Sequence, residues 1–418
     1  MSFDLDNPDA FLGCMMALEG VRDSMSIIHG PTGCKMYPAD LSERTFVNRG
    51  PEVETRNPFS RGMKYFFYQP RLPCTLLDGK RTIMGSSKDL DELYDIVKGH
   101  DPRMIGIINS PGASLIGEDL DKVDSDIPTV RIDSHDYSSF SYDGYSSTAI
   151  KIIDTIAKER RDVRKGTVNI IGLSLLHIRF EDSSEELRRM LSLCGIKVNT
   201  VLCAGSSVDE IEDISSAELN LVVDEDYGSK VAEHLRDRFG TPYVSIMPIG
   251  FQNCEDLINT VCSIMGKDPS AAIDDITRWR KRTAKRIQTL EKRYVRIGGR
   301  TFSVHGTPCL TENLAHLMED YLGLIPCALQ SDREIEGFEL FGSKVSDDVW
   351  DTEVDVVFAS GPEVRVLIDR HIAIGGVEIR EESERPVSII GRPLFGTMGT
   401  VSLMEDVLNI LTRTFDRV

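Results

Sequence analysis

The chain has 418 residues, 41% of them hydrophobic and 28% charged, which allows two or three domains with buried cores and is not the composition of a disordered chain. Its net charge of −19 argues against general binding to nucleic-acid phosphates, which needs a basic face, and disfavours contact with anionic membranes. No apolar run approaches the roughly 20 residues of a membrane span, and the first residues, MSFDLDNPDAF, lack the pattern of a signal peptide. We therefore expect a cytoplasmic protein with no membrane or nucleic-acid partner.

Short runs rich in β-branched residues alternate with helical patterns along the chain. This alternation predicts βαβ units and parallel sheets, and therefore an α/β fold. Strands are predicted at 104–108, 129–132, 168–171, 197–202, 219–223, 243–247, 301–304 and 355–358. Helices are predicted at 90–98, 149–159, 184–193, 229–239, 255–265 and 311–322.

Two charged segments divide the chain into three blocks. A hinge, KERRDVRKGT at 158–167, and a long helical stretch at 271–296 separate predicted domains at 1–163, 164–270 and 271–418. The long stretch holds nine cations, which is typical of a solvated helix that bridges domains. Nucleic-acid binding is the alternative, but it conflicts with the acidic chain as a whole.

Several common functional motifs are absent from the sequence. The nine cysteines are scattered, and no two have C-x-x-C spacing, which disfavours a zinc ribbon or a thioredoxin-like site. There is neither a G-x-x-x-x-G-K-[ST] phosphate loop nor a G-x-G-x-x-G turn after a strand. The chain is therefore not expected to hydrolyse ATP or to hold NAD by the usual devices.

One motif places a thiol on a glycine turn, in SIIHGPTGCKMYP at 26–38. The apolar run predicts a strand, and Gly30 and Gly33 allow close backbone approach before a helix. A cysteine at the start of a helix, Cys34, should have a lowered pKa, because backbone N–H groups point at it. A thiolate there suits a metal or an iron–sulfur cluster. The alternative is a tight turn with a packed, inert thiol.

The same motif, HGPTGC at 29–34, resembles the H-G-x-x-G-C signature of the nitrogenase component 1 family. MGSSKDLDELYDIV at 84–97, MIGIINSPGASLIGEDL at 104–120 and GRPLFGTMG at 391–399 resemble further family segments, in the family's order. The family includes catalytic MoFe-type subunits, scaffold subunits on which their cofactor matures, and tetrapyrrole reductases. The resemblance covers most of the chain and implies three Rossmann-like α/β domains with mostly parallel sheets.

The resemblance also implies candidate ligands. The family's H-G-x-x-G-C cysteine ligates a cluster between two subunits, and Cys34 matches it, with Gly30 and Gly33 letting the backbone approach. A second family cysteine, at the start of a helix, corresponds to a position near Asp9, with Cys14 one turn further on. Either residue could substitute as a ligand. The alternative for Cys14 is a place in a helix core.

Other family ligands are replaced in this chain. A third cluster cysteine corresponds to Pro111, which cannot ligate, and Cys74 is the candidate to compensate for it. The catalytic subunit holds its large cofactor through one Cys and one His, which correspond here to Asp224 and Phe395. Reduction of dinitrogen on such a cofactor within this chain is therefore not expected. An aromatic block, YFFY at 65–68, is interpreted as interface packing or as the wall of a cofactor cavity.

The resemblance implies a β-type or tetrapyrrole-reductase-type subunit of a nitrogenase-like oxidoreductase. Its cluster, [4Fe–4S] or larger, would be shared with a homologous subunit in a homo- or hetero-oligomer. Electrons would come from a separate ATP-dependent iron protein, which agrees with the missing phosphate loop. One alternative is a non-catalytic scaffold for assembly of a metallocofactor. Another is a family member without a cluster, in which Cys34 is a packed thiol.

Overall fold

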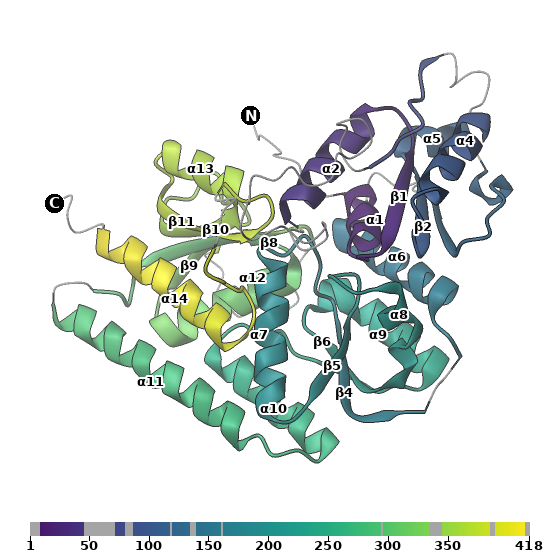
Figure 1. Cartoon of the computed structure of the whole chain (residues 1–418). Coiled ribbons are helices and arrows are strands. Elements are labelled where there is room, and N and C mark those ends of the chain that lie inside the picture. The colour runs from purple at the N-terminus through teal and green to yellow at the C-terminus, as the bar shows by residue number, and fades with distance from the viewer. Residues whose placement is uncertain are drawn as a thin grey trace, which may run out of the picture.

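Three parallel sheets, each with helices packed against it, make up the chain in the computed structural model (Figure 1). The structure describes residues 9–45, 72–79, 87–117, 119–133, 139–159, 162–293, 296–333, 345–384 and 389–413. The aromatic block at 65–68 lies outside the described residues. The predicted α/β fold with parallel sheets is confirmed, since every ladder between named strands is parallel.

The first sheet has the order β1-β2-β3 and carries the glycine turn at the carboxyl end of β1. Its strands are β1 (Ser24–His29), β2 (Met104–Asn109) and β3 (Thr129–Asp133). Its helices are α1 (Ala10–Glu19), α2 (Gly33–Thr45), α4 (Ser87–Lys98), α5 (Pro111–Ile116) and α6 (Ser141–Ile156), with a 3-10 turn at Leu120–Lys122. The segment 73–77 also runs parallel to β1 and bonds to it, through Ile28 N to Pro73 O (3.0 Å) and Thr75 N to Ile28 O (3.2 Å).

The second sheet has the order β5-β4-β6-β7 and follows α6. Its strands are β4 (Arg164–Ile171), β5 (Lys197–Val201), β6 (Ala217–Val222) and β7 (Tyr243–Ser245). The helices are α7 (Phe180–Leu193), α8 (Val208–Glu212), α9 (Glu225–Phe239) and α10 (Phe251–Met265), with a 3-10 turn at Ile214–Ser216. β4 begins inside the predicted charged hinge, because Arg164 pairs with Asp213 and the Gly166 amide donates to Glu218 Oε2 (2.6 Å).

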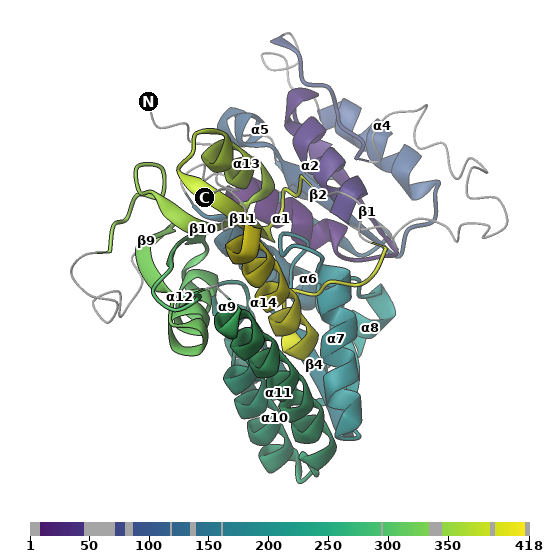
Figure 2. The same ribbon diagram turned by 90° about the vertical axis from the view of Figure 1, so that its left-hand side faces the viewer.

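The third sheet has the order β11-β10-β8-β9. Its strands are β8 (Thr301–Gly306), β9 (Ile325–Ser331), β10 (Val354–Ser360) and β11 (Ala373–Arg380). The helices are α11 (Ser270–Lys292), α12 (Pro308–His316), α13 (Gly361–Asp369) and α14 (Gly396–Arg413), with a π turn at Leu317–Tyr321. α11 is the predicted long basic helix, and Figure 2 shows it lying beside α14 and α10 on the outside of the molecule.

α6 packs closely on α1 because both helices carry a glycine at the crossing. A Cβ atom on Gly13 would lie 1.8 Å from Ser141 O, and one on Gly144 would lie 2.0 Å from Ala10 O. Real Cβ atoms do not approach backbone oxygens so closely, so neither position accepts a larger residue without a shift of the helices. None of the described helices is both long enough and apolar enough to cross a membrane.

We predict that Gly13→Ala destabilises the protein, because its new methyl group must push α6 away from α1. Overpacking of this kind costs about 1–3 kcal/mol, so the midpoint of urea unfolding, followed by circular dichroism, should fall. Gly112→Ala in α5 is the matched control, since a Cβ there meets nothing within 4 Å. An unchanged midpoint for Gly13→Ala would show that the two helices can separate freely.

Candidate functional site

Cys34 lies in the first turn of α2, directly after the turn that ends β1. Its backbone N–H donates to Pro31 O at 3.1 Å, so the thiol is carried at the amino end of the helix. Gly30 is needed for this geometry, because a Cβ on it would lie 2.3 Å from Ser110 Oγ at the end of β2. A Cβ on Gly33, by contrast, would meet nothing within 4 Å. The space beside Gly33 is therefore open next to the half-buried thiol of Cys34.

Cys74 reaches the same end of the sheet on the segment 73–77 beside β1. Its Sγ donates to Gly30 O at 3.0 Å, and the next residue holds the segment in register. Thr75 Oγ1 accepts from Gly30 N (3.1 Å) and is hydrogen-bonded to His29 Nδ1 (3.0 Å). His29 of the HGPTGC motif thus holds the segment that carries Cys74 in place, although His29 and Cys74 lie far apart in the sequence.

The pKa values of the two thiols are raised, not lowered. Burial raises the pKa of Cys34, a hydrogen bond with Ser110 lowers it in part, and the charge of Asp9 raises it again. Burial also raises the pKa of Cys74, where backbone contacts and the charge of Lys35 act against it. The prediction that the start of the helix lowers the pKa of Cys34 is therefore wrong, because burial outweighs the helix dipole. Both thiols stay protonated at neutral pH unless a cation replaces the proton.

Asp9 approaches this thiol pair, whereas Cys14 does not. Asp9 caps α1 by accepting from Leu12 N (2.8 Å), and its carboxylate is close enough to affect the pKa of Cys34. Cys14 is buried between α1 and α6, where its Sγ donates to Gly144 O (3.4 Å). Of the predicted ligands, the structure therefore brings Cys34, Cys74 and Asp9 to one end of β1 and leaves Cys14 in the helix core.

Three residues at this site were not predicted: Ser110, Thr75 and Lys35. Ser110 follows β2 directly and Thr75 follows Cys74, so only their places at strand ends could have indicated them. Lys35 is 5% exposed and directly follows the signature cysteine. Its charge favours the thiolate form of Cys74.

We predict that Thr75→Val loosens the segment 73–77, because the variant cannot bond to Gly30 N or to His29. The loss leaves the buried Gly30 N–H without its acceptor and should cost about 1–3 kcal/mol. The rate at which Cys74 is alkylated by iodoacetamide, measured by mass spectrometry of its peptide, should rise. Thr75→Ser keeps the hydroxyl group and should label at the wild-type rate. Equal rates for Thr75→Val and wild type would contradict this account of the segment.

A second group of candidate residues lies where the carboxyl ends of the second and third sheets meet. Asp224, at the end of β6, is fully buried and accepts from His177 Nε2 (2.9 Å). His177 Nδ1 accepts from Ser174 N (3.0 Å), so the proton of the ring is on Nε2. The ring lies between Tyr227 and Phe395, with centroid distances of 4.9 and 5.2 Å.

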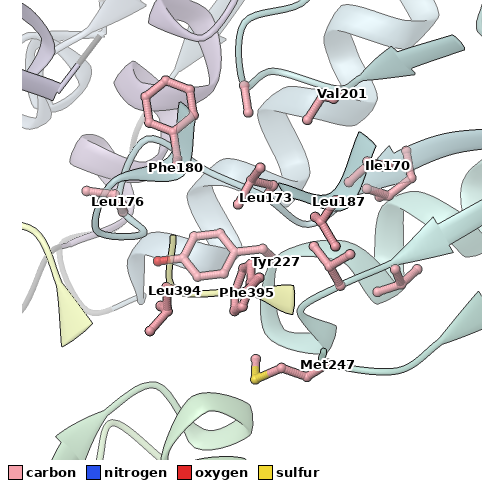
Figure 3. Close-up of a cluster of buried hydrophobic side chains, with 14 of the residues drawn as sticks. Ile170, Leu173, Leu176, Phe180, Leu187, Val201, Tyr227, Met247, Leu394 and Phe395 are labelled. Carbon is pink, nitrogen blue, oxygen red and sulfur yellow. The ribbon is translucent and has the colours of Figure 1, made fainter. Parts of the chain in front are cut away.

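The two positions that the family resemblance matches to ligands of a large cofactor, Asp224 and Phe395, are thus both in contact with His177, and the region is filled. Asp224 is bonded to His177, and Phe395 belongs to the cluster of buried hydrophobic side chains in Figure 3. The cavity beside them, lined by His177, Tyr227 and Asp332 among others, has a volume of 20 Å³. Such a volume holds about one water molecule. These residues therefore do not fit a large metallocofactor.

Two ionisable residues at the end of β11, Arg380 and Glu381, line the same small cavity, and Arg380 is ion-paired to Glu363. Glu363 caps α13, accepts from Arg380 Nη2 (2.9 Å) and pairs with His305 Nδ1 (2.6 Å). Burial raises the pKa of Glu363, but Arg380 and His305 outweigh it and hold this pKa well below its ordinary range. Burial raises the pKa of Glu381, which lines the cavity, to about 7. The cavity wall therefore combines an arginine that is ion-paired to Glu363 with an acid, Glu381, that titrates near neutral pH.

Asp226, in the first turn of α9, also titrates near neutral pH. Burial and the neighbouring charge of Asp224 raise the pKa of Asp226 to about 7, from an ordinary value of 3.8. The unfolded chain loses this proton near pH 4 and the folded chain near pH 7. The stability that the neutral carboxyl contributes is therefore fully present below pH 4 and is lost as the pH rises to 7.

We predict that Asp226→Asn raises the midpoint of urea unfolding at pH 8 much more than at pH 5. The amide stays neutral and still accepts from Cys309 N, which lies 2.9 Å from Asp226 Oδ2. The gain should approach roughly 1.4 kcal/mol for each unit by which the pKa is raised. Asp237→Asn, an exposed position on the same helix, is the control and should show no such pH dependence. A gain that is equal at both pH values would mean that Asp226 is ionised in the folded protein.

A family model described as nitrogenase component 1 type oxidoreductase matches residues 10–412. The chain therefore belongs to the nitrogenase component 1 type oxidoreductases. Within this class it is 23% identical to the nitrogenase molybdenum-iron protein beta chain of Methanococcus maripaludis, over 96% of this chain and 92% of that one. It is also 23% identical to one subunit of the light-independent protochlorophyllide reductase of Chlorobium phaeobacteroides, over 63% of this chain and 47% of that protein.

A solved structure described as nitrogenase Cp1 at pH 6.5 has the same fold. Its TM-score is 0.79, with 15% sequence identity, over 98% of this chain and 93% of that one. The predicted membership of the nitrogenase component 1 family, and the predicted likeness to β-type and tetrapyrrole-reductase subunits, are confirmed by these comparisons.

Proposed function

We propose that the chain is a subunit of a nitrogenase-like reductase that holds an iron–sulfur cluster, [4Fe–4S] or larger, at the carboxyl end of β1. The observation that carries this proposal is that Cys34 and Cys74, from separate segments, present half-buried thiols at one end of the same strand. Asp9 is the further candidate ligand. Gly30 keeps the turn close to β2, and Gly33 leaves open space beside Cys34.

The donors present suit an iron–sulfur cluster but do not complete its ligand set. Thiolates are the usual ligands of such clusters, and a carboxylate oxygen can also bind iron. Among the described residues, no group of three or more His, Cys, Asp or Glu is arranged to hold a metal ion. The remaining ligands would therefore come from a homologous partner subunit. When bound, the cluster would supply one-electron transfer at low potential.

Exposed apolar side chains around the thiol pair support a partner at this end of the sheet. Met36 is 54% exposed on α2, Leu76 is 50% exposed beside Cys74, and Leu115 is 81% exposed on α5. A homologous subunit, in a homo- or hetero-oligomer, would cover these side chains and enclose the cluster. The two relatives named above are each, by their names, one part of a larger assembly.

An ATP-dependent iron protein is proposed as the electron donor. The sequence has no phosphate-loop motif of its own, which supports a separate protein as the place of ATP hydrolysis. The chain's own residues would bind the cluster, shield it from water and orient it. Free thiols at all nine cysteines agree with a reducing compartment such as the cytoplasm.

An assembly scaffold is the alternative function. The filled region around Asp224 and Phe395 limits where such a scaffold could hold a cofactor. A scaffold of this chain would hold its cargo at the thiol pair, since the cavity beside His177 and Tyr227 measures only 20 Å³. The two functions differ in turnover: a reductase consumes ATP and reductant when substrate is present, whereas a scaffold transfers its cluster to an acceptor protein once.

We predict that anaerobically purified protein, co-expressed with its partner subunit, contains iron and acid-labile sulfide and gives an EPR signal when reduced. Cys34→Ser should lose most of the iron, and Cys74→Ser should lose iron or change the EPR signal. Cys327→Ser, a half-buried cysteine on β9, is the control and should keep all of it.

Two results would count against the proposal. If Cys34→Ser folds and keeps its full iron and sulfide content, Cys34 is not a ligand. If the wild-type protein contains no iron even with its partner present, the chain is a family member without a cluster, and Cys34 is a packed thiol of the turn.

A further inference from the structure

The groove between α11 and α14 shares no lining residue with either site described above and has the size of a ligand pocket. The two helices run side by side on the outside of the molecule (Figures 1 and 2). The volume of the groove is 480 Å³, within the range of roughly 300–1,000 Å³ that is usual for small-molecule sites. α11, the longest helix among the described residues, thus borders a hollow on the side that faces α14.

One wall of the groove is a stripe of α11 that combines an indole ring with two cations. Trp279, Arg282 and Arg286 line the groove and are spaced by three and four residues, so they share one face of the helix. The guanidinium of Arg282 lies 5.2 Å from the centroid of the Trp279 ring. This contact holds the indole in place beside a positive charge.

The floor of the groove is apolar and belongs to α14. Val401, Met404 and Leu408 line it at helical spacing. Met404 is 1% exposed and Leu408 is 8% exposed, so both are anchored in the core below. The groove therefore has an apolar base and a basic rim, which is the arrangement that an amphipathic anion requires.

The two arginines at the rim are not neutralised by ion pairs of the fold. Arg278 pairs with Asp275, and Arg280 pairs with Glu255 at 2.9 Å, whereas Arg282 and Arg286 form no ion pair within the described part of the chain. The one acid lining the groove, Glu405 on α14, pairs with Arg392 at 3.5 Å. α11 carries seven cations and three acids, a net charge of 7 − 3 = +4, in a chain of net charge −19.

We propose that this groove binds a small amphipathic anion. Its apolar, preferably aromatic, body lies on Met404 and Leu408 against the Trp279 ring, and its carboxylate, sulfonate or phosphate group is held by Arg282 and Arg286. The charge and the volume both favour a small molecule: guanidinium groups bind such oxyanions by paired hydrogen bonds, and the hollow between the two helices has room for one aromatic body. The inference does not depend on the cluster at Cys34.

The test uses 8-anilinonaphthalene-1-sulfonate, an aromatic sulfonate, with the full chain. The chain has two tryptophans, Trp279 and Trp350, so a Trp350→Phe background makes Trp279 the sole indole reporter. We expect saturable quenching of the Trp279 emission with one equivalent of the probe. Arg282→Gln with Arg286→Gln should weaken this binding by about tenfold, because charge-assisted hydrogen bonds are lost.

A matched control separates the groove from the general charge of α11. Lys281→Gln with Lys285→Gln removes the same charge from the same helix one position earlier, outside the groove lining, and should leave the affinity unchanged. Urea midpoints of both double variants should equal that of the Trp350→Phe background.

Three results would overturn the proposal. The first is the absence of saturable quenching. The second is an equal loss of affinity in the two double variants, which would mean that the probe follows charge alone. The third is a concentration-dependent dimer, seen by sedimentation, from which the probe is excluded, since the groove would then be covered by a second copy of the chain.

Discussion

The packing of α6 determines how the parts of the chain are positioned relative to one another. The backbone of its amino-terminal half is in direct contact with the backbone of α1, and only glycines at the crossing, Gly13 and Gly144, permit this contact. On its other side, the Tyr145 hydroxyl lies 2.9 Å from the carbonyl oxygens of both Leu173 and Leu202, which follow strands of the second sheet. Buried carbonyl groups keep their hydrogen bonds, so the Tyr145 side chain has little freedom to move. α6 therefore holds the first sheet rigidly against the second.

The same helix extends this constraint to the third sheet. Arg333, which follows β9, lies over the Tyr142 ring at 4.5 Å and donates to its hydroxyl at 2.9 Å. Elements from three sheets therefore converge on one turn of α6. The His177 ring lies 4.9 Å from that of Tyr227, whose hydroxyl lies 3.2 Å from Ser141 Oγ in the first turn of α6. Asp9, whose charge acts on Cys34, forms a bridge with Phe140 directly before that turn. Both candidate sites are therefore held against the amino-terminal end of the same packed helix.

Local patterns in the sequence predicted the elements whose burial is regular, and missed those whose burial is not. The strands of the second sheet are apolar and β-branched, so their positions were predicted well. The helix predicted at 149–159 begins at Ser141, because its first buried turns are made of Tyr, Gly and Ser, which show no apolar period. β9 and β11 were not predicted: Pro326 interrupts the first, and Gly375 and Gly376 interrupt the second. The predicted limits of the three domains stay a prediction.

The chemistry of the thiol site shows where local reasoning about the sequence ends. The position of Cys34 at the start of a helix was readable from HGPTGC, but the direction of its pKa depends on burial by distant segments. Raised pKa values mean that both thiols are protonated before a metal arrives, so that binding must release protons and becomes tighter as the pH rises. A protonated thiol is also a poor nucleophile, which makes both thiols slow to oxidise. On the proposed function, burial thus makes the thiol pair inert alone and reactive only toward a cation that can replace its protons.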